Sequence, residues 1–290
     1  MEYFTELAER VKVVHENDVF LPSEYLYEKI FCGMLIVAAG CTVVYLASFY
    51  ILDNVLKVET KSAQHRSKLC YQITNLVFNT VIALSGLYLE YILVPSLDQY
   101  DSTNDIDIIT GYQEVYLVST LQLGYQLWAI PVGILYAGEN ATMIIHHFAV
   151  VISATTSGCL TNGFRMYSPF FYGIMEISSL PLSIMNTIKE NPDTLQRQYP
   201  TANLVSRVTF GASFLFIRTY LCAYRWPRFL LLNFMTVYTK PAWDLHKIFM
   251  VVQFSLAVFL NNVQFYWAFL ILKGFAKLLL PSKKTKTKKT

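Results

Sequence analysis

The sequence predicts an all-α membrane protein with about seven transmembrane helices. Of its 290 residues, 54% are hydrophobic and only 15% are charged, whereas soluble domains average roughly 25% charged residues. Aromatic residues make up 15% of the chain, and their amphipathic rings suit the membrane interface and lipid-facing helices. The mean hydropathy of +0.38 agrees with this composition. Too little sequence lies between the apolar runs to form a soluble domain.

Seven stretches are long and apolar enough to cross the hydrocarbon core as helices, which takes about 20 residues each. The first, "IFCGMLIVAAGCTVVYLASFYIL", carries no charge at all. A shorter apolar piece at 226–238 is predicted to lie at the interface or to re-enter the membrane, because it is too short to span. An eighth span there would reverse the two ends of the chain relative to each other. The predicted spans are 30–52, 71–94, 115–135, 141–160, 169–188, 205–224 and 248–272.

The basic residues in the loops predict the orientation, because cytosolic loops carry more Lys and Arg. The loop after the first span holds four basic residues, and the next loop, 95–114, has five acids and no base. We therefore expect the first loop in the cytosol, the acidic segment 1–29 on the far side and the C-terminus in the cytosol. Four basic residues are exceptions to this rule, because the orientation places them on the far side: Arg225, Arg228, Lys240 and Lys247.

The last five residues, "KTKKT", place Lys286 and Lys288 in the KxKxx form of the dilysine retrieval signal. Cytosolic coat proteins read such a signal, so it predicts residence in the endoplasmic reticulum membrane. The alternative is a lysine-rich anchor near anionic lipid. Because the lysines directly follow an apolar helix, the tail does not indicate nucleic-acid binding.

Two adjacent histidines, His146 and His147, interrupt the apolar run "MIIHHFAVV". Adjacent helical residues point about 100° apart, so we expect one imidazole to face an interior cavity and the other to brace a neighbouring helix. A histidine with an acid from another span would suit general base catalysis on an alcohol or amine. The alternative is that both histidines only form hydrogen bonds between helices. A metal site is disfavoured, because no third ligand occurs at a suitable spacing.

The segment "MEISSLPLSIMN" supplies an acid beside a predicted bend. Pro181 should kink the helix, with Ser178 and Ser179 satisfying the freed carbonyls. Ionisable groups at membrane depth usually face the interior of a bundle, so Glu176 is expected to point inward. Arg218 in "FLFIRTYL" is either its counter-ion or a snorkelling side chain.

The histidine pair and these two segments, in this order, resemble the signature of the TLC domain. The resemblance covers about 67–277, after a first helix and loop at 30–66 and before a basic tail at 278–290. It implies a barrel of six helices in the endoplasmic reticulum membrane, with the histidines facing its cavity. The predicted cavity residues are Glu139, Asn162, Arg165, Pro181, Asn186 and Arg218.

In the ceramide synthase branch of that family, paired histidines serve acyl transfer from acyl-CoA to a long-chain base. Asn162 and Arg165 are similar to an Asn and an Arg of that branch. The chain departs from it at "MYSPFFYGIMEIS", which stands in place of a His-Asp…Asp cluster and leaves Glu176 as its one acid. The sequence is therefore more similar to the smaller TLC-domain-containing proteins, which influence membrane lipid composition.

The main hypothesis is a protein of the endoplasmic reticulum that binds lipid acyl chains, has membrane lipids as partners and needs no cofactor. The enzyme alternative is an acyltransferase with acyl-CoA as co-substrate, in which His146 or His147 is base or acyl acceptor and Glu176 orients it. A third possibility is a cargo or translocation factor with the same fold. The lipid and the oligomeric state do not follow from the sequence.

Overall fold

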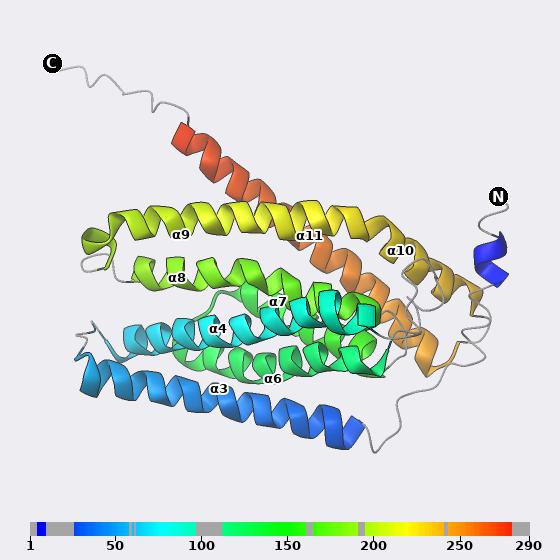
Figure 1. Ribbon diagram of the computed structural model, residues 1–290, viewed down its shortest axis with the longest axis horizontal. Helices are drawn as coiled ribbons and strands as arrows, with labels where there is room; N and C mark the ends of the chain where they lie inside the picture. The colour runs from blue at the N-terminus through cyan, green and yellow to red at the C-terminus, as the bar shows by residue number, and fades with distance from the viewer. Residues whose placement is uncertain are drawn as a thin grey trace.

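Seven antiparallel helical passes, each running along the length of the molecule, form an elongated bundle in the computed structural model (Figure 1). The structure describes residues 5–9, 26–57, 60, 62–96, 112–160, 165–190, 195–240 and 243–279. Within these ranges the regular structure is helical throughout. The start of the first pass and the end of the last lie at opposite ends of the bundle (Figure 1).

The first four passes are nearly continuous helices with irregular turns at their ends. The first consists of η1 (Leu26–Phe31), α3 (Cys32–Tyr50) and η2 (Ile51–Val55). The second consists of α4 (Ala63–Tyr88), η3 (Leu89–Leu93) and η4 (Val94–Ser96). The third is η5 (Gln113–Val115), α6 (Tyr116–Val132) and η6 (Gly133–Ala137), and the fourth is α7 (Ala141–Ser153) and η7 (Ala154–Leu160).

The last three passes are more irregular, except for the final helix. The fifth holds η8 (Arg165–Tyr167), η9 (Pro169–Gly173), η10 (Ile174–Ser178) and α8 (Ser179–Glu190). The sixth holds α9 (Pro200–Ser213), η12 (Phe214–Leu221) and α10 (Cys222–Thr239), and the seventh is α11 (Leu245–Leu279). Wide π-type turns such as η7 and η12 often occur at functional sites, and both contribute to the cavity described below.

All seven predicted spans coincide with helical passes, so the predicted fold class is confirmed. Among the described residues, four helices are long and apolar enough to cross a membrane: 27–55, 63–96, 141–160 and 245–277. The fifth pass is divided by Gly173 and the turn Ile174–Ser178, where helix geometry is lost just before Pro181. A proline ring clashes with the carbonyl four residues earlier, which here belongs to Ile177, so the predicted bend lies where Pro181 requires it.

Of the two predicted positions of 226–238, at the interface or re-entrant, the re-entrant one is wrong. These residues belong to α10, which continues the sixth pass without a reversal. Phe229, Leu232 and Met235 are buried against Ala257 of α11 and against Leu7. This packing extends the helix beyond the length that its apolar run alone predicted.

The first pass lies outside the barrel, on α4 and α6. Trp128 of α6 stacks on Tyr71 of α4 with ring centroids 5.5 Å apart and meets the edge of Tyr45 of α3 at 5.7 Å. α3 approaches α6 closely at Gly124, where a Cβ atom would lie 2.5 Å from the Cβ atom of Val37. The remaining six passes enclose the interior.

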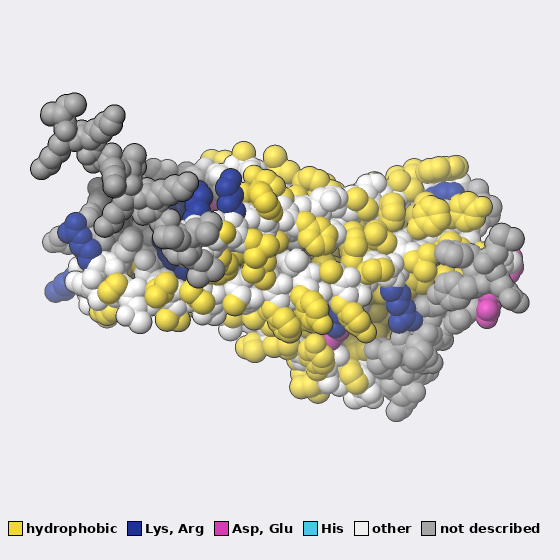
Figure 2. Space-filling model, turned by 90° about the horizontal axis from the view of Figure 1, so that it is seen from above, with side chains coloured by type: hydrophobic (Ala, Val, Ile, Leu, Met, Phe, Trp, Pro, Cys, Tyr) yellow, Lys and Arg dark blue, Asp and Glu magenta, His cyan; other side chains and the backbone are white. Residues whose placement is uncertain are grey.

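The surface of the bundle suits a lipid environment. Figure 2 shows hydrophobic side chains over the middle of one face and Lys and Arg side chains towards its two ends. Large exposed apolar side chains include Ile36 and Val43 on α3 and Phe216 and Tyr220 on η12. On a soluble protein such a surface would promote aggregation. In a membrane the same side chains pack against the hydrocarbon of the lipids.

Candidate functional site

Within the described residues, the interior of the barrel holds two adjacent chambers. The large chamber has a volume of about 350 Å³ and is walled by α4, α6, α7, η10, α8, α9, η12 and α11. The small chamber, of about 70 Å³, lies among α6, α7, η7, η8, η9, η10, η12, α10 and α11. His146, Glu176 and Arg218 line both chambers, so these side chains form a shared part of the two walls. No residue of α3 lines either one.

A buried ion pair stands at this junction. Arg218 Nη2 lies 3.2 Å from Glu176 Oε2, with side-chain exposures of 8% and 13%. The guanidinium also donates to Ser178 Oγ at 2.7 Å, to Ser179 Oγ at 3.0 Å and to the Met175 carbonyl at 3.1 Å. An arginine supplies this fixed fork of donors. The turn Ile174–Ser178 and the first residue of α8 bring these four acceptors to the guanidinium. Of the two predicted roles of Arg218, the structure therefore shows the counter-ion of Glu176.

The two serines of the bend have different partners. Ser178 Oγ donates to the Met175 carbonyl and not to the Ile177 carbonyl beside Pro181. Ser179 Oγ instead donates to Glu176 Oε2 at 2.5 Å. The acid is therefore held by Arg218 and Ser179, and the structure shows no hydrogen bond from it to either histidine within the described residues.

Both histidines of α7 are buried and both line the large chamber. His146 is 8% exposed and His147 is 7% exposed, and their ring centroids are 5.9 Å apart. His146 also meets the edge of the Trp267 ring at 5.2 Å. Neither Nδ1 atom has a hydrogen-bond partner within the described residues. The geometry differs from the expectation of one cavity-facing and one bracing imidazole, since both face the large chamber.

The wall of the large chamber is polar as well as aromatic. Tyr125 on α6 donates to Asn75 Oδ1 on α4 at 3.0 Å. Asn79 Oδ1 and Gln126 Oε1 are buried without a partner in the described part of the chain. Glu139 and Asn186, both predicted as cavity residues, line this chamber.

The other predicted cavity residues have different outcomes. Pro181 lies at the bend and lines neither chamber. Asn162 and the side chain of Arg165 lie outside the described part of the structure, as do Lys286 and Lys288. Among the residues that the structure describes, no three His, Cys, Asp or Glu side chains gather as a metal site.

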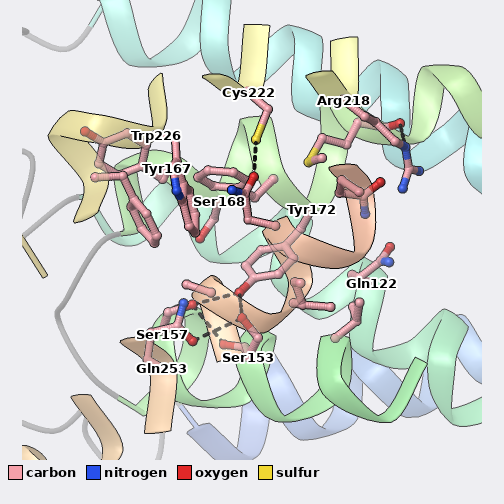
Figure 3. A pocket seen from close by; sticks show the side chains of 18 of the residues that line it. Gln122, Ser153, Ser157, Tyr167, Ser168, Tyr172, Arg218, Cys222, Trp226 and Gln253 are labelled. Carbon is pink, nitrogen blue, oxygen red and sulfur yellow. Dashed lines mark hydrogen bonds between the residues drawn. The ribbon is translucent and has the colours of Figure 1, made fainter. Parts of the chain in front are cut away.

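The small chamber contains residues that the sequence reasoning did not single out (Figure 3). Tyr172 OH lies 2.6 Å from Ser153 Oγ and 2.9 Å from Ser157 Oγ. Gln253 Oε1 accepts from Ser153 Oγ at 3.0 Å. A signal was present, because Gln253 interrupts the last apolar run, but its partners come from other passes and no spacing links them.

A helical barrel that crosses a membrane and encloses a polar chamber defines this chain as a multi-pass membrane protein with an internal site. The model of the TLC domain matches residues 67–273, which span the six passes around the two chambers. The chain belongs to the TLC domain family. A comparison with curated proteins gives no match.

Proposed function

We propose that this chain is a protein of the endoplasmic reticulum membrane that binds a lipid inside its barrel and influences membrane lipid composition. The observation that carries the proposal is the large chamber of about 350 Å³ with unpartnered polar atoms in its wall. Protein interiors are normally filled to crystal-like density, and buried polar groups normally have partners. This chamber is unfilled and has unpartnered polar atoms in its wall, so it is suited to a polar ligand group.

The two kinds of wall suggest how the lipid lies. The Arg218–Glu176 pair, the two histidines and the amides offer donors and acceptors to a polar head. Phe210, Phe214, Leu270 and Ile271 line the same chamber and offer apolar contacts to the hydrocarbon next to that head. The KxKxx tail supports residence in the endoplasmic reticulum.

Native mass spectrometry of the purified chain tests this proposal. The wild-type protein should carry co-purified lipid, and Asn186→Trp should lose most of it, because a large ring at this wall position fills the chamber. Ile184→Trp is the matched control, since Ile184 is 43% exposed on the same helix and lines neither chamber. Absence of lipid from the wild type, or equal lipid in both variants, would overturn the proposal.

The acyltransferase alternative is favoured by one further observation. A histidine that served only to join helices would have a hydrogen-bond partner on a neighbouring helix, but both Nδ1 atoms lack one within the described residues. In this reaction an imidazole takes the proton as the amine of a long-chain base attacks the thioester carbon of acyl-CoA. A C–N bond forms, the C–S bond breaks, and the departing thiolate receives the proton.

Purified protein supplied with acyl-CoA and a long-chain base should release free CoA if the alternative holds. His146→Ala or His147→Ala should then abolish this release in protein that remains folded, as thermal unfolding checks. CoA release at the wild-type rate in both variants would exclude the histidines as catalytic base or acyl acceptor. No release by the wild type would exclude the acyltransferase alternative, and lipid binding would remain as the proposed function.

A further inference from the structure

The small chamber joins apolar walls to polar side chains that the lipid-binding proposal does not use. Its apolar lining includes Val150, Phe171, Met175 and Leu260. Its polar lining comes from several passes, and Figure 3 shows Gln122, Ser168, Tyr172 and Gln253 around one space. This arrangement places hydrogen-bonding groups where hydrocarbon would otherwise be expected.

One part of this polar lining is fully paired and fixes the geometry of the wall. The hydroxyls of Tyr172, Ser153 and Ser157 form a short chain, and Gln253 Oε1 accepts from Ser153 and from Thr156 at 3.1 Å. These bonds tie α7 and η7 to η9 and to α11. Networks of this kind hold their members in one arrangement, so the chamber keeps its shape without a ligand.

The other part of the polar lining is unpaired. Gln122 Oε1, Gln264 Oε1 and Ser168 Oγ are buried without a hydrogen-bond partner among the described residues. Their residues are 2%, 4% and 2% exposed, and they come from three different passes. Two of the three atoms are amide oxygens that only accept, so the missing partner is a hydrogen-bond donor. A buried acceptor left unsatisfied is unfavourable, which favours a ligand that donates.

We propose that the small chamber binds a hydroxyl group on the hydrocarbon chain of a lipid whose polar end lies in the large chamber. This inference rests on the proposed lipid binding. The two chambers are adjacent, because His146, Glu176 and Arg218 line both of them, so a lipid whose polar end lies in the large chamber has its hydrocarbon chain within reach of the small one. A hydroxyl donates a hydrogen bond, as a glutamine oxygen requires, and a volume of about 70 Å³ suits a small group. A sterol carries its single hydroxyl at one end and cannot serve both chambers.

Competition between oleic acid and ricinoleic acid tests the proposal, because the two differ by one mid-chain hydroxyl. The full-length wild-type protein is mixed with both acids, and the bound fractions are measured by native mass spectrometry. We expect ricinoleic acid to be preferred by about tenfold, the effect of one or two neutral hydrogen bonds. A hydroxyl donates a single hydrogen, so at least one of Gln122→Leu and Gln264→Leu should bring this preference close to one.

Gln126→Leu is the matched control. Gln126 lies one turn from Gln122 on α6, is 2% exposed and has an unpartnered Oε1, but it lines only the large chamber. Its loss should affect both acids equally and leave the preference unchanged. If either small-chamber variant fails to fold, the other still reports on the preference.

Equal binding of the two acids by the wild type would overturn the inference and leave lipid binding standing. A preference that survives in both Gln122→Leu and Gln264→Leu would also overturn it, because the hydroxyl would then bind elsewhere. Binding of neither acid, together with no co-purified lipid, would overturn the proposed function itself.

Discussion

At the residue scale, the Arg218–Glu176 pair shows how the chain holds charge at membrane depth. The guanidinium has four acceptors, and all of them lie within the segment 175–179. A lysine could not meet the same set, because its ammonium is a point charge without a planar fork. The pair therefore fixes the sixth pass against the bend of the fifth.

Arg218→Met should destabilise the protein strongly. It leaves Glu176 buried without a counter-ion, and breaking a buried pair in this way costs about 3–5 kcal/mol. The double variant Glu176→Gln with Arg218→Met removes both charges and should recover part of that loss. Denaturant unfolding of the wild type, Arg218→Met, Glu176→Gln and the double variant in detergent measures both effects. A double variant as unstable as the sum of its single variants would contradict this account of the pair.

Glu139 predicts a pH dependence, because it lies in the hairpin before α7, outside the membrane-spanning segments. Burial raises the pKa of its carboxyl above the ordinary value of 4.5, and Glu190 acts in the same direction, against the Asn140 backbone N–H and Lys68. Its contribution to stability is therefore complete in acid and is lost as the pH rises through the raised pKa.

Glu139→Gln should raise the unfolding temperature at neutral pH, because the amide cannot ionise and keeps the oxygen that accepts from Asn140. The gain should disappear as the pH falls below 4.5, where the wild-type carboxyl is protonated in both states. Unfolding temperatures across this pH range provide the measurement, and a gain of the same size at every pH would exclude ionisation as the cause.

At the element scale, small residues let the second and fifth passes meet backbone to backbone. A Cβ atom on Gly86 of α4 would lie 2.6 Å from the Gly173 Cα atom and 2.6 Å from the Pro169 carbonyl oxygen. Such contacts are typical of membrane helices, which pack closely where side chains are small. The same contact positions η9 and η10, and hence Glu176.

Gly86→Ala should therefore destabilise the fold by about 1–3 kcal/mol, the usual range for overpacking, and should lower the amount of bound lipid. The matched control is Gly274→Ala on α11, where a Cβ atom meets nothing within 4 Å. Alanine there should be neutral or slightly stabilising, because it is the better helix former. Thermal unfolding and native mass spectrometry of the two variants decide the matter, and equal effects would contradict the close approach.

The seven passes could be predicted because each is an apolar run of membrane length. The inward position of Glu176 and its pairing with Arg218 could be inferred, because ionisable groups at membrane depth need partners. The small chamber could not be inferred. Ser153, Tyr172 and Gln253 become neighbours only when three passes pack together, and no periodicity within one helix indicates this. The length of α10 likewise depends on burial against Leu7 and Ala257.

At the scale of the whole molecule, an odd number of passes puts the start of the first pass and the end of the last at opposite ends of the bundle (Figure 1). The loops after α3 and α8 and the end of α11 lie at one end of the bundle (Figure 1). Lys57, Lys68, Lys189 and Arg197 belong to this end, which we expect in the cytosol. At the other end Arg225 pairs with Glu90 and lies over the Phe170 ring, so the charge of one of the four exceptions is neutralised in the folded protein.

The tail provides the test of this orientation, because a KxKxx signal acts only on the cytosolic side. Changing Lys286 and Lys288 together to Ser should move a tagged protein from the endoplasmic reticulum to later membranes, as seen by microscopy. Changing Lys283 and Lys284 to Ser removes the same charge outside the motif and should leave the location unchanged. If both pairs act alike, the tail is a basic anchor near anionic lipid. If neither pair acts while a C-terminal tag is protected from protease in sealed microsomes, the tail lies in the lumen and the predicted orientation is reversed.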